Sequence, residues 1–143
     1  MTNTEIKKAW EVMKKEIKKE LGLDYGFTMN AKQINNRTAT YLVCNTRSYE
    51  DEIRLEQESI EKVMGYSTWT EAEKARRKEN GEKQIARHTA LLEKFGTKEN
   101  ELRMTHEAIL NSKAFKKFAS NFESVTTEFE IKENFYYYIR FNY

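Results

Sequence analysis

Proline is absent from the 143-residue sequence, cysteine occurs once and glycine five times. The single cysteine, Cys44, has no partner for a disulfide within the chain, so packing must hold the fold, as is usual in a reducing compartment. No stretch approaches the roughly 20 consecutive apolar residues of a membrane-spanning helix, and charged residues stand near the N-terminus where a signal peptide would be apolar. The sequence therefore predicts an intracellular, cytoplasmic protein with no membrane partner.

An excess of charge of either sign is also lacking, since 25 lysines and arginines face 23 acidic residues, for a formal net charge of +2. This balance excludes the global charge excess that is typical of histone-like or DNA-mimicking proteins. Aromatic residues reach 13%, which is too many for a disordered chain. No Pro-, Gly- or Ser-rich linker divides the sequence, so we expect a single domain over residues 1–143.

A helix is predicted from Thr2 to Leu23. Thr2 and Glu5 have the spacing of a capping box, and Gly22 is suited to a left-handed C-terminal cap. Apolar residues recur on one stripe of this helix, as expected for a face that packs on a core. They are Ile6, Trp10, Met13, Ile17 and Leu21.

A helical hairpin is predicted in the middle of the chain. Its first helix begins after Ser48 and ends at Gly65, and its second begins after Thr70 and ends at Gly96. The pair Asn80-Gly81 predicts a break or kink in the second helix. We expect the two helices to pack antiparallel with a solvated end, because the residues before the break are almost all charged. Two further helices are expected after Thr97 and Ser112.

Strand patterns flank these helices. Near the N-terminus, residues 28–34 and 38–44 surround a turn-prone Asn-Asn-Arg cluster and predict a β-hairpin. Near the C-terminus, apolar residues alternate with polar ones over residues 125–131 and 135–143, which predicts a second hairpin with Phe129, Ile139 and Phe141 in the core. The sequence thus predicts an α+β fold: an antiparallel sheet of about four strands from two hairpins, packed with about five helices.

Residues for catalysis or metal binding are scarce. A zinc site needs about four ligands with local spacing, whereas the only histidines, His88 and His106, lie on separate predicted helices. We interpret them as half-buried members of helix faces and expect no metal and no cofactor. A Cys44 nucleophile activated by a histidine is an alternative without local support. The glycines are isolated, so no phosphate-binding loop is present, and carboxylate pairs such as Glu50 with Asp51 are typical of surface charge.

Two surfaces are candidate binding sites. On the last predicted strand, Tyr136, Tyr138 and Arg140 share one face, where they could form a stacking platform with a cation for phosphate, as in single-strand nucleic-acid binders. The alternative is that tyrosine is simply a good strand residue and that helices cover this face.

The second surface is a basic arm on the second helix of the helical hairpin, which could contact a phosphate backbone or an acidic protein. Glutamates interrupt the arm, so the alternative is a solvated face with little net field. The basic residues are Lys74, Arg76, Arg77, Lys78, Lys83 and Arg87.

The lysine-rich opening helix, the absence of proline and the Phe/Tyr-rich end from Phe135 to Tyr143 together resemble the small accessory proteins of bacterial phages and mobile elements. Some of those proteins are anti-CRISPR or other anti-defence inhibitors, and the resemblance implies a protein that binds and blocks a larger host assembly. The likeness is one of composition and assigns a role to no residue. The near-neutral charge departs from the strongly acidic DNA-mimic members.

We therefore expect a non-enzymatic macromolecule-binding protein whose partner is a host protein or nucleoprotein complex. A nucleic-acid-binding module that uses the C-terminal sheet face and the basic arm is the first alternative, and an uncharacterised small enzyme is the second. A homodimer through exposed aromatic residues is compatible with all three.

Overall fold

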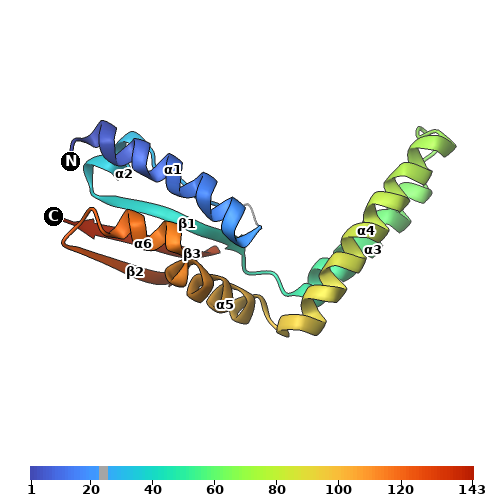
Figure 1. Ribbon diagram of the computed structural model, residues 1–143. Coiled ribbons are helices and arrows are strands. Elements are labelled where there is room, and N and C mark those ends of the chain that lie inside the picture. Colours follow the sequence, from blue (N-terminus) through green and yellow to red (C-terminus); the bar gives the residue numbers. More distant parts are fainter. Residues whose placement is uncertain (23–25) are drawn as a thin grey trace. The chain divides into compact units, whose positions relative to one another are not determined.

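The computed structural model describes residues 1–22 and 26–143, which form six helices and three strands (Figure 1). The α+β class is confirmed, with three strands where about four were expected. The predicted helix end at Leu23 lies outside the described residues. In chain order the elements are α1 (Asn3–Leu21), α2 (Ala31–Asn35), β1 (Thr38–Asn45), α3 (Tyr49–Met64), α4 (Glu71–Phe95), α5 (Lys98–Asn111), α6 (Lys113–Ala119), β2 (Ser124–Ile131) and β3 (Asn134–Asn142).

The chain divides into two compact units. The sheet unit consists of Met1–Thr46, without residues 23–25, and Leu102–Tyr143, and the hairpin unit consists of Arg47–Glu101. The prediction of one domain stays a prediction, because compactness alone does not show whether the units fold separately. None of the helices in the described ranges has both the length and the apolar character needed to cross a membrane.

The first helix, α1, has the predicted caps at both ends, Thr2 and Gly22. The Thr2 hydroxyl accepts from the Glu5 N–H at 3.2 Å, and the Glu5 carboxylate accepts from the Thr2 N–H at 2.8 Å. Gly22 closes the helix in the left-handed region at φ 71°, which costs glycine little. The stripe of Ile6, Trp10, Met13 and Ile17 is buried, so α1 contributes one side of the core.

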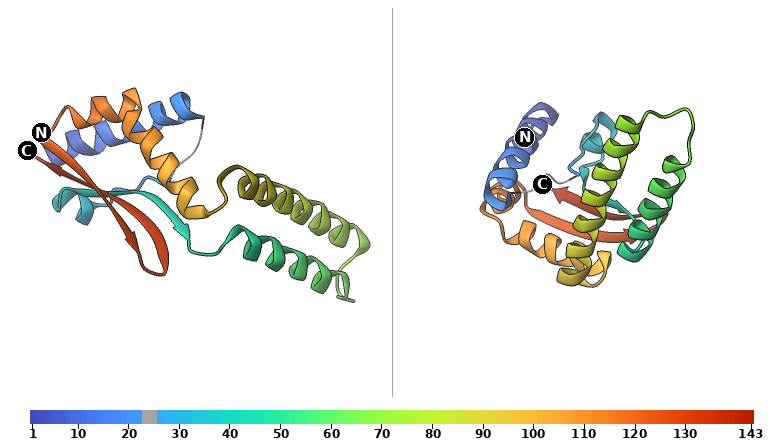
Figure 2. Two further views of the ribbon diagram at one scale, coloured as in Figure 1. Left: turned by 90° about the horizontal axis from the view of Figure 1, so that it is seen from below. Right: turned by 90° about the vertical axis from the view of Figure 1, so that its right-hand side faces the viewer.

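The sheet of the sheet unit is antiparallel, with the order β1-β3-β2 and β3 in the middle. Figure 2 shows α1, α5 and α6 on one side of it. Tyr137, Ile139 and Phe141 alternate along β3 on this helix-covered side and are buried. Ile139 pairs with Ala39 of β1, which is also buried. The core therefore lies between one face of the sheet and the helices.

The predicted N-terminal hairpin is half right: residues 38–44 lie in the strand β1, but residues 28–34 do not form its partner strand. Residues 31–35 form α2, because Asn30 and Gln33 complete a capping box and Ile34 turns into the core. Before α2, the described residues pair with β1 only at an isolated bridge between Thr28 and Thr40. The main partner of β1 is β3, near the other end of the chain.

The predicted C-terminal hairpin is confirmed as β2 and β3, in register from Ser124 opposite Asn142 to Ile131 opposite Phe135. Ile139 and Phe141 are fully buried, whereas Phe129 is half-buried and packs against the core from the edge strand β2. Ile131 is 56% exposed, because it lies at the far end of that edge strand.

In the hairpin unit, α3 and α4 lie side by side and antiparallel (Figures 1 and 2). Their N-caps, Ser48 and Thr70, accept backbone hydrogen bonds as predicted. The predicted break at Asn80-Gly81 is wrong, since α4 is continuous and Gly81 is buried in it. A Cβ at Gly81 would come within 2.4 Å of Ile60 Cδ1, so this glycine allows α3 to approach.

Candidate binding surfaces

The three candidate residues of the last strand share the side of β3 that faces away from α1, α5 and α6. Tyr136 and Tyr138 are half-buried and Arg140 is exposed. They alternate with the buried Tyr137 and Ile139, so the pleat of the strand turns them to the opposite face. Within the sheet unit, this face is therefore not the one that those helices cover.

The two tyrosine rings form one aromatic strip. The ring centroids of Tyr136 and Tyr138 are 5.7 Å apart, and the ring planes differ by only 13°. Burial, followed by the negative charge of Glu130, raises the pKa of the Tyr138 hydroxyl. Tyr138 therefore stays a neutral hydrogen-bonding group, with an aromatic ring beside it.

Two carboxylates of β2 flank this strip. The register places Glu128 opposite Tyr138 and Glu130 opposite Tyr136. Lys132 Nζ lies 3.0 Å from Glu130 Oε1, and that hydrogen bond is the main cause that raises the pKa of the lysine. We call Glu128, Glu130, Tyr136, Tyr138 and Arg140 the tyrosine face.

A hollow of about 230 Å³ lies at the tyrosine face. Tyr138 and the two glutamates line it together with Arg140 and Thr38. Sequence reasoning found the tyrosines and the arginine from their alternation. It missed the two glutamates as their neighbours, because only the β2–β3 register places them there.

The basic arm of α4 is largely neutralised by neighbouring carboxylates. Arg77 turns toward α3, where its guanidinium lies 2.5 Å from Glu56 Oε1 and donates to Ser59 Oγ at 2.9 Å. Among the described residues, Arg76 and Arg87 alone of the six have no ion pair within 4.0 Å. The other pairs lie one turn apart on α4: Lys74 with Glu71, Lys78 with Glu82, and Lys83 with Glu79.

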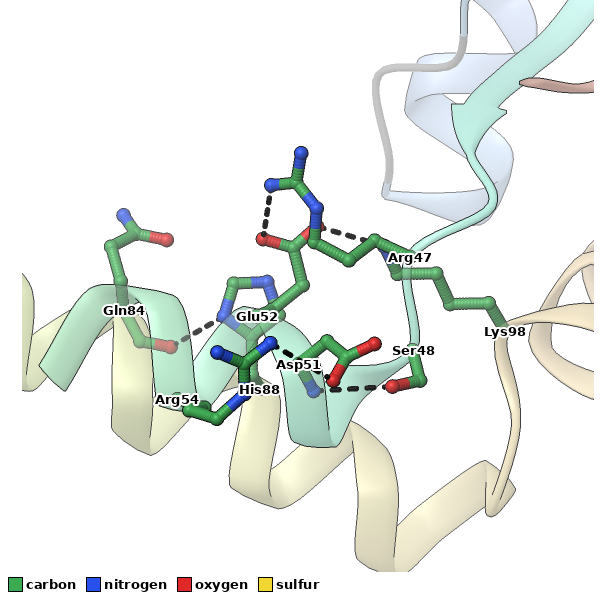
Figure 3. Close-up of polar contacts among 8 residues, drawn as sticks. All are labelled: Arg47, Ser48, Asp51, Glu52, Arg54, Gln84, His88 and Lys98. Carbon is green, nitrogen blue, oxygen red and sulfur yellow. Dashed lines mark hydrogen bonds and ion pairs between the residues drawn. The ribbon is translucent and has the colours of Figure 1, made fainter. Parts of the chain in front are cut away.

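Charges at the base of the hairpin unit serve packing (Figure 3). Glu52 lies between Lys98 Nζ at 3.0 Å and an Arg47 guanidinium nitrogen at 3.6 Å, and the side chains of Lys98 and Glu52 are only 12% and 17% exposed. This network joins the start of α3 to the start of α5. In the same view, His88 Nδ1 forms a hydrogen bond with the Gln84 carbonyl at 2.9 Å. Both residues lie on α4, so this contact is internal to that helix.

The second histidine, His106, lies in the sheet unit and lines a cleft of about 340 Å³. Its Nδ1 bonds to the hydroxyl of the fully buried Tyr41, and its Nε2 lies 3.3 Å from Thr127 Oγ1. Burial lowers the pKa of His106 and raises that of Tyr41. Both ring nitrogens of His106 therefore have protein partners, and His106 satisfies the buried hydroxyl of Tyr41.

An apolar groove of about 330 Å³ lies between α1 and α6. Small residues, Ala9 and Ala114, and larger ones, Val12 and Phe118, line it. The lining also includes polar side chains, namely Glu5, Lys8, Glu16, Lys117 and Asn121. Glu16 and Lys117 pair with each other at 3.6 Å, and the mixed charges indicate no particular partner. In residues 1–22 and 26–143, no three side chains of the His, Cys, Asp or Glu type come together as a metal site would require.

Comparisons of the chain with family models, with curated proteins and with solved structures gave no match.

Proposed function

We propose that the protein is a non-enzymatic binding protein that recognises another protein, alone or in a nucleoprotein complex, through its tyrosine face. The observation that supports this proposal is the flanking of the stacked Tyr136 and Tyr138 rings by Glu128 and Glu130. Tyrosine gives large contact area at low entropic cost and is enriched at protein interfaces. The accessory inhibitors that the composition resembles also act on protein assemblies.

The charges of the tyrosine face favour a protein over a nucleic acid. Nucleic-acid binding derives much of its affinity from contacts between cations and phosphates. Arg140 is the one cation of the face, and the nearby Lys132 is already paired with Glu130. A phosphate backbone laid over the tyrosines would therefore meet two carboxylates, whereas a cationic side chain of a protein would be attracted by both the carboxylates and the rings.

The charges of the hairpin unit also favour a protein partner over a nucleic acid. Four of the six basic residues in the arm have carboxylate partners within 4.0 Å. Residues 47–101 as a whole contain more acidic than basic residues. Its field at a distance is therefore weak, and steering of a nucleic acid toward the arm is not expected.

Nucleic-acid binding is the second candidate function, because the stacked tyrosines and the exposed Arg140 are also the parts of a single-strand platform. In that function the glutamates would oppose binding and Lys132 would assist it. The two functions thus differ in the sign that each charge contributes.

The experiment compares two kinds of partner for the same variants. Protein captured from cells after nuclease treatment should be lost with Tyr138→Ala and retained with Tyr66→Ala, since Tyr66 is an exposed tyrosine in the loop between α3 and α4. A labelled single strand of about 20 nucleotides should bind only weakly at physiological salt. Submicromolar, salt-sensitive binding of that strand, lost with Arg140→Ala, would establish the second function instead.

A further inference from the structure

The two outer edges of the sheet are protected to different degrees. At the β1 edge, Thr28 and Thr40 exchange two backbone hydrogen bonds, and the Gln33 side chain donates to the Thr40 hydroxyl at 3.0 Å. At the β2 edge, none of the strands that the structure describes pairs with the side away from β3. Such an edge is a template for a further strand.

The phase of the β2–β3 ladder shows which backbone groups this edge offers. Thr40 uses its backbone N–H and C=O for Thr28, so its pair partner Tyr138 directs its own N–H and C=O toward Glu128 of β2. Antiparallel ladders alternate such bonded pairs with non-bonded pairs. The N–H and C=O groups of Val125, Thr127 and Phe129 therefore point away from β3. They are spaced two residues apart, as an added strand requires.

We infer that the β2 edge is the docking edge for an extended segment of a partner protein, which adds a strand to the sheet and carries lysine or arginine at alternate positions. This inference rests on the proposed function and specifies the chemistry of the partner. Main-chain hydrogen bonds along β2 give affinity in this mode, and the side chains on the two faces give specificity.

Charge complementarity on the tyrosine face selects the basic side chains. Glu128 and Glu130 lie on β2, so they are the direct neighbours of an added strand on that face. The Lys132 ammonium already forms an ion pair with Glu130 and so acts as an internal cation at this position. A lysine or arginine from the partner can replace it there and lie beside the rings of Tyr136 and Tyr138.

The opposite face of the same edge accepts the intervening side chains. The cleft beside His106 is lined by Thr127 and Phe129 of β2 and by Arg103 and Glu107 of α5. Phe129 is half-buried there, so apolar surface remains at the edge. A segment that alternates basic and medium-sized apolar residues fits both faces.

A second copy of β2 fits this edge poorly. Antiparallel pairing of two β2 strands would place Glu128 and Glu130 of one copy against the acidic face of the other. Like charges on adjacent strands destabilise such a pair. The same charges therefore disfavour self-association and favour a basic partner.

The test uses a blocked, fluorescein-labelled peptide of about eight residues in which arginine and valine alternate. A peptide of the same composition with all arginines in one block is the control, because it has the charge without the alternation. We expect the alternating peptide to bind at least about tenfold more tightly, and its binding to slow amide exchange at Val125, Thr127 and Phe129 by at least about tenfold.

Charge variants locate the contact. Glu128→Gln with Glu130→Gln should weaken peptide binding about tenfold, and Lys132→Gln should strengthen it, because Glu130 then loses its internal cation. Glu11→Gln, an exposed glutamate of α1, is the matched control and should leave binding unchanged.

Four results would overturn the inference. Three concern the peptide: no binding of the alternating peptide, equal binding of the block peptide, or binding without protection of those amides. Protection of the same amides in the free protein would show that a second copy occupies the edge, and would overturn it too. If any of these results is found but a protein is still captured in a Tyr138-dependent way, strand addition is rejected. The proposed function of protein binding is then retained. Arg140-dependent, salt-sensitive binding of single strands would instead reject the proposed function itself.

Discussion

The sheet unit and the hairpin unit stabilise their helices by different means. In the sheet unit, large side chains such as Trp10, Tyr41 and Phe141 are fully buried between the sheet and the helices. In α3 and α4, only Tyr49, Val63 and Gly81 are buried. These two helices also have side-chain caps at their N-termini and ion pairs on their surfaces. Two helices alone enclose little volume, so the hairpin unit depends more on local interactions, which are individually weak.

The largest expected effect concerns the core of the sheet unit. Phe141→Ala should lower the free energy of unfolding by about 3–5 kcal/mol, because the fully buried ring packs against Phe118 and Phe122 and leaves a cavity. Chemical denaturation measures the loss. Tyr66→Ala, at a 38% exposed position, should cost less than about 1 kcal/mol. Equal losses at the two positions would remove the distinction between a packed and a solvated aromatic residue.

The second prediction concerns the contact between α3 and α4. Gly81→Ala should destabilise the hairpin unit by about 1 kcal/mol, although alanine normally stabilises a helix interior by a similar amount, because the new Cβ meets Ile60. Thermal unfolding followed by circular dichroism gives the sign. In an Ile60→Ala background the same change should become neutral or stabilising. A stabilising effect of Gly81→Ala in the unmodified chain would mean that α3 does not constrain α4 there.

The third prediction concerns the pH dependence of stability that His106 should cause. Burial lowers the pKa of His106 below its ordinary value of 6.5, so the unfolded chain binds its proton first as the pH falls. Stability should therefore decrease as the pH falls from 6.5 to the lowered pKa, and should be constant with respect to this group above that window.

Melting temperatures across this pH range test the assignment. His106→Gln should reduce the pH dependence, because it removes the group whose pKa burial lowers. An unchanged pH dependence in His106→Gln would show that another group causes it.

Features that depend on neighbouring residues were predictable from the sequence. The caps at Thr2, Ser48 and Thr70 follow from side chains three residues apart, and all three are present. The strand alternation around Tyr138 likewise follows from a period of two. Local patterns failed where a local alternative competed, as at Asn30, whose capping box with Gln33 starts α2 in place of a strand.

Features that depend on distant residues could not be predicted. β1 pairs with β3 across most of the chain length, and no local signal indicates that pairing. Gly81 looks like a helix break until Ile60 is placed against it. For the same reason, only part of the tyrosine face was predictable from the sequence. The alternation along the strand identifies the two tyrosines and Arg140, whereas the β2–β3 register is needed to place Glu128 and Glu130 beside them.

The smallest structural change gives the most direct test of the account. Lys132→Gln removes one exposed charge and should alter stability by less than about 0.5 kcal/mol, as is usual for a surface ion pair. Its effect on binding has opposite signs under the two candidate functions. The measurement is the affinity of Lys132→Gln, relative to the unmodified protein, for the alternating arginine-valine peptide and for single-stranded DNA. We predict that Lys132→Gln binds the peptide more tightly and that DNA binding stays weak. Weaker peptide binding, together with salt-sensitive DNA binding that the substitution reduces, would contradict protein recognition by the tyrosine face.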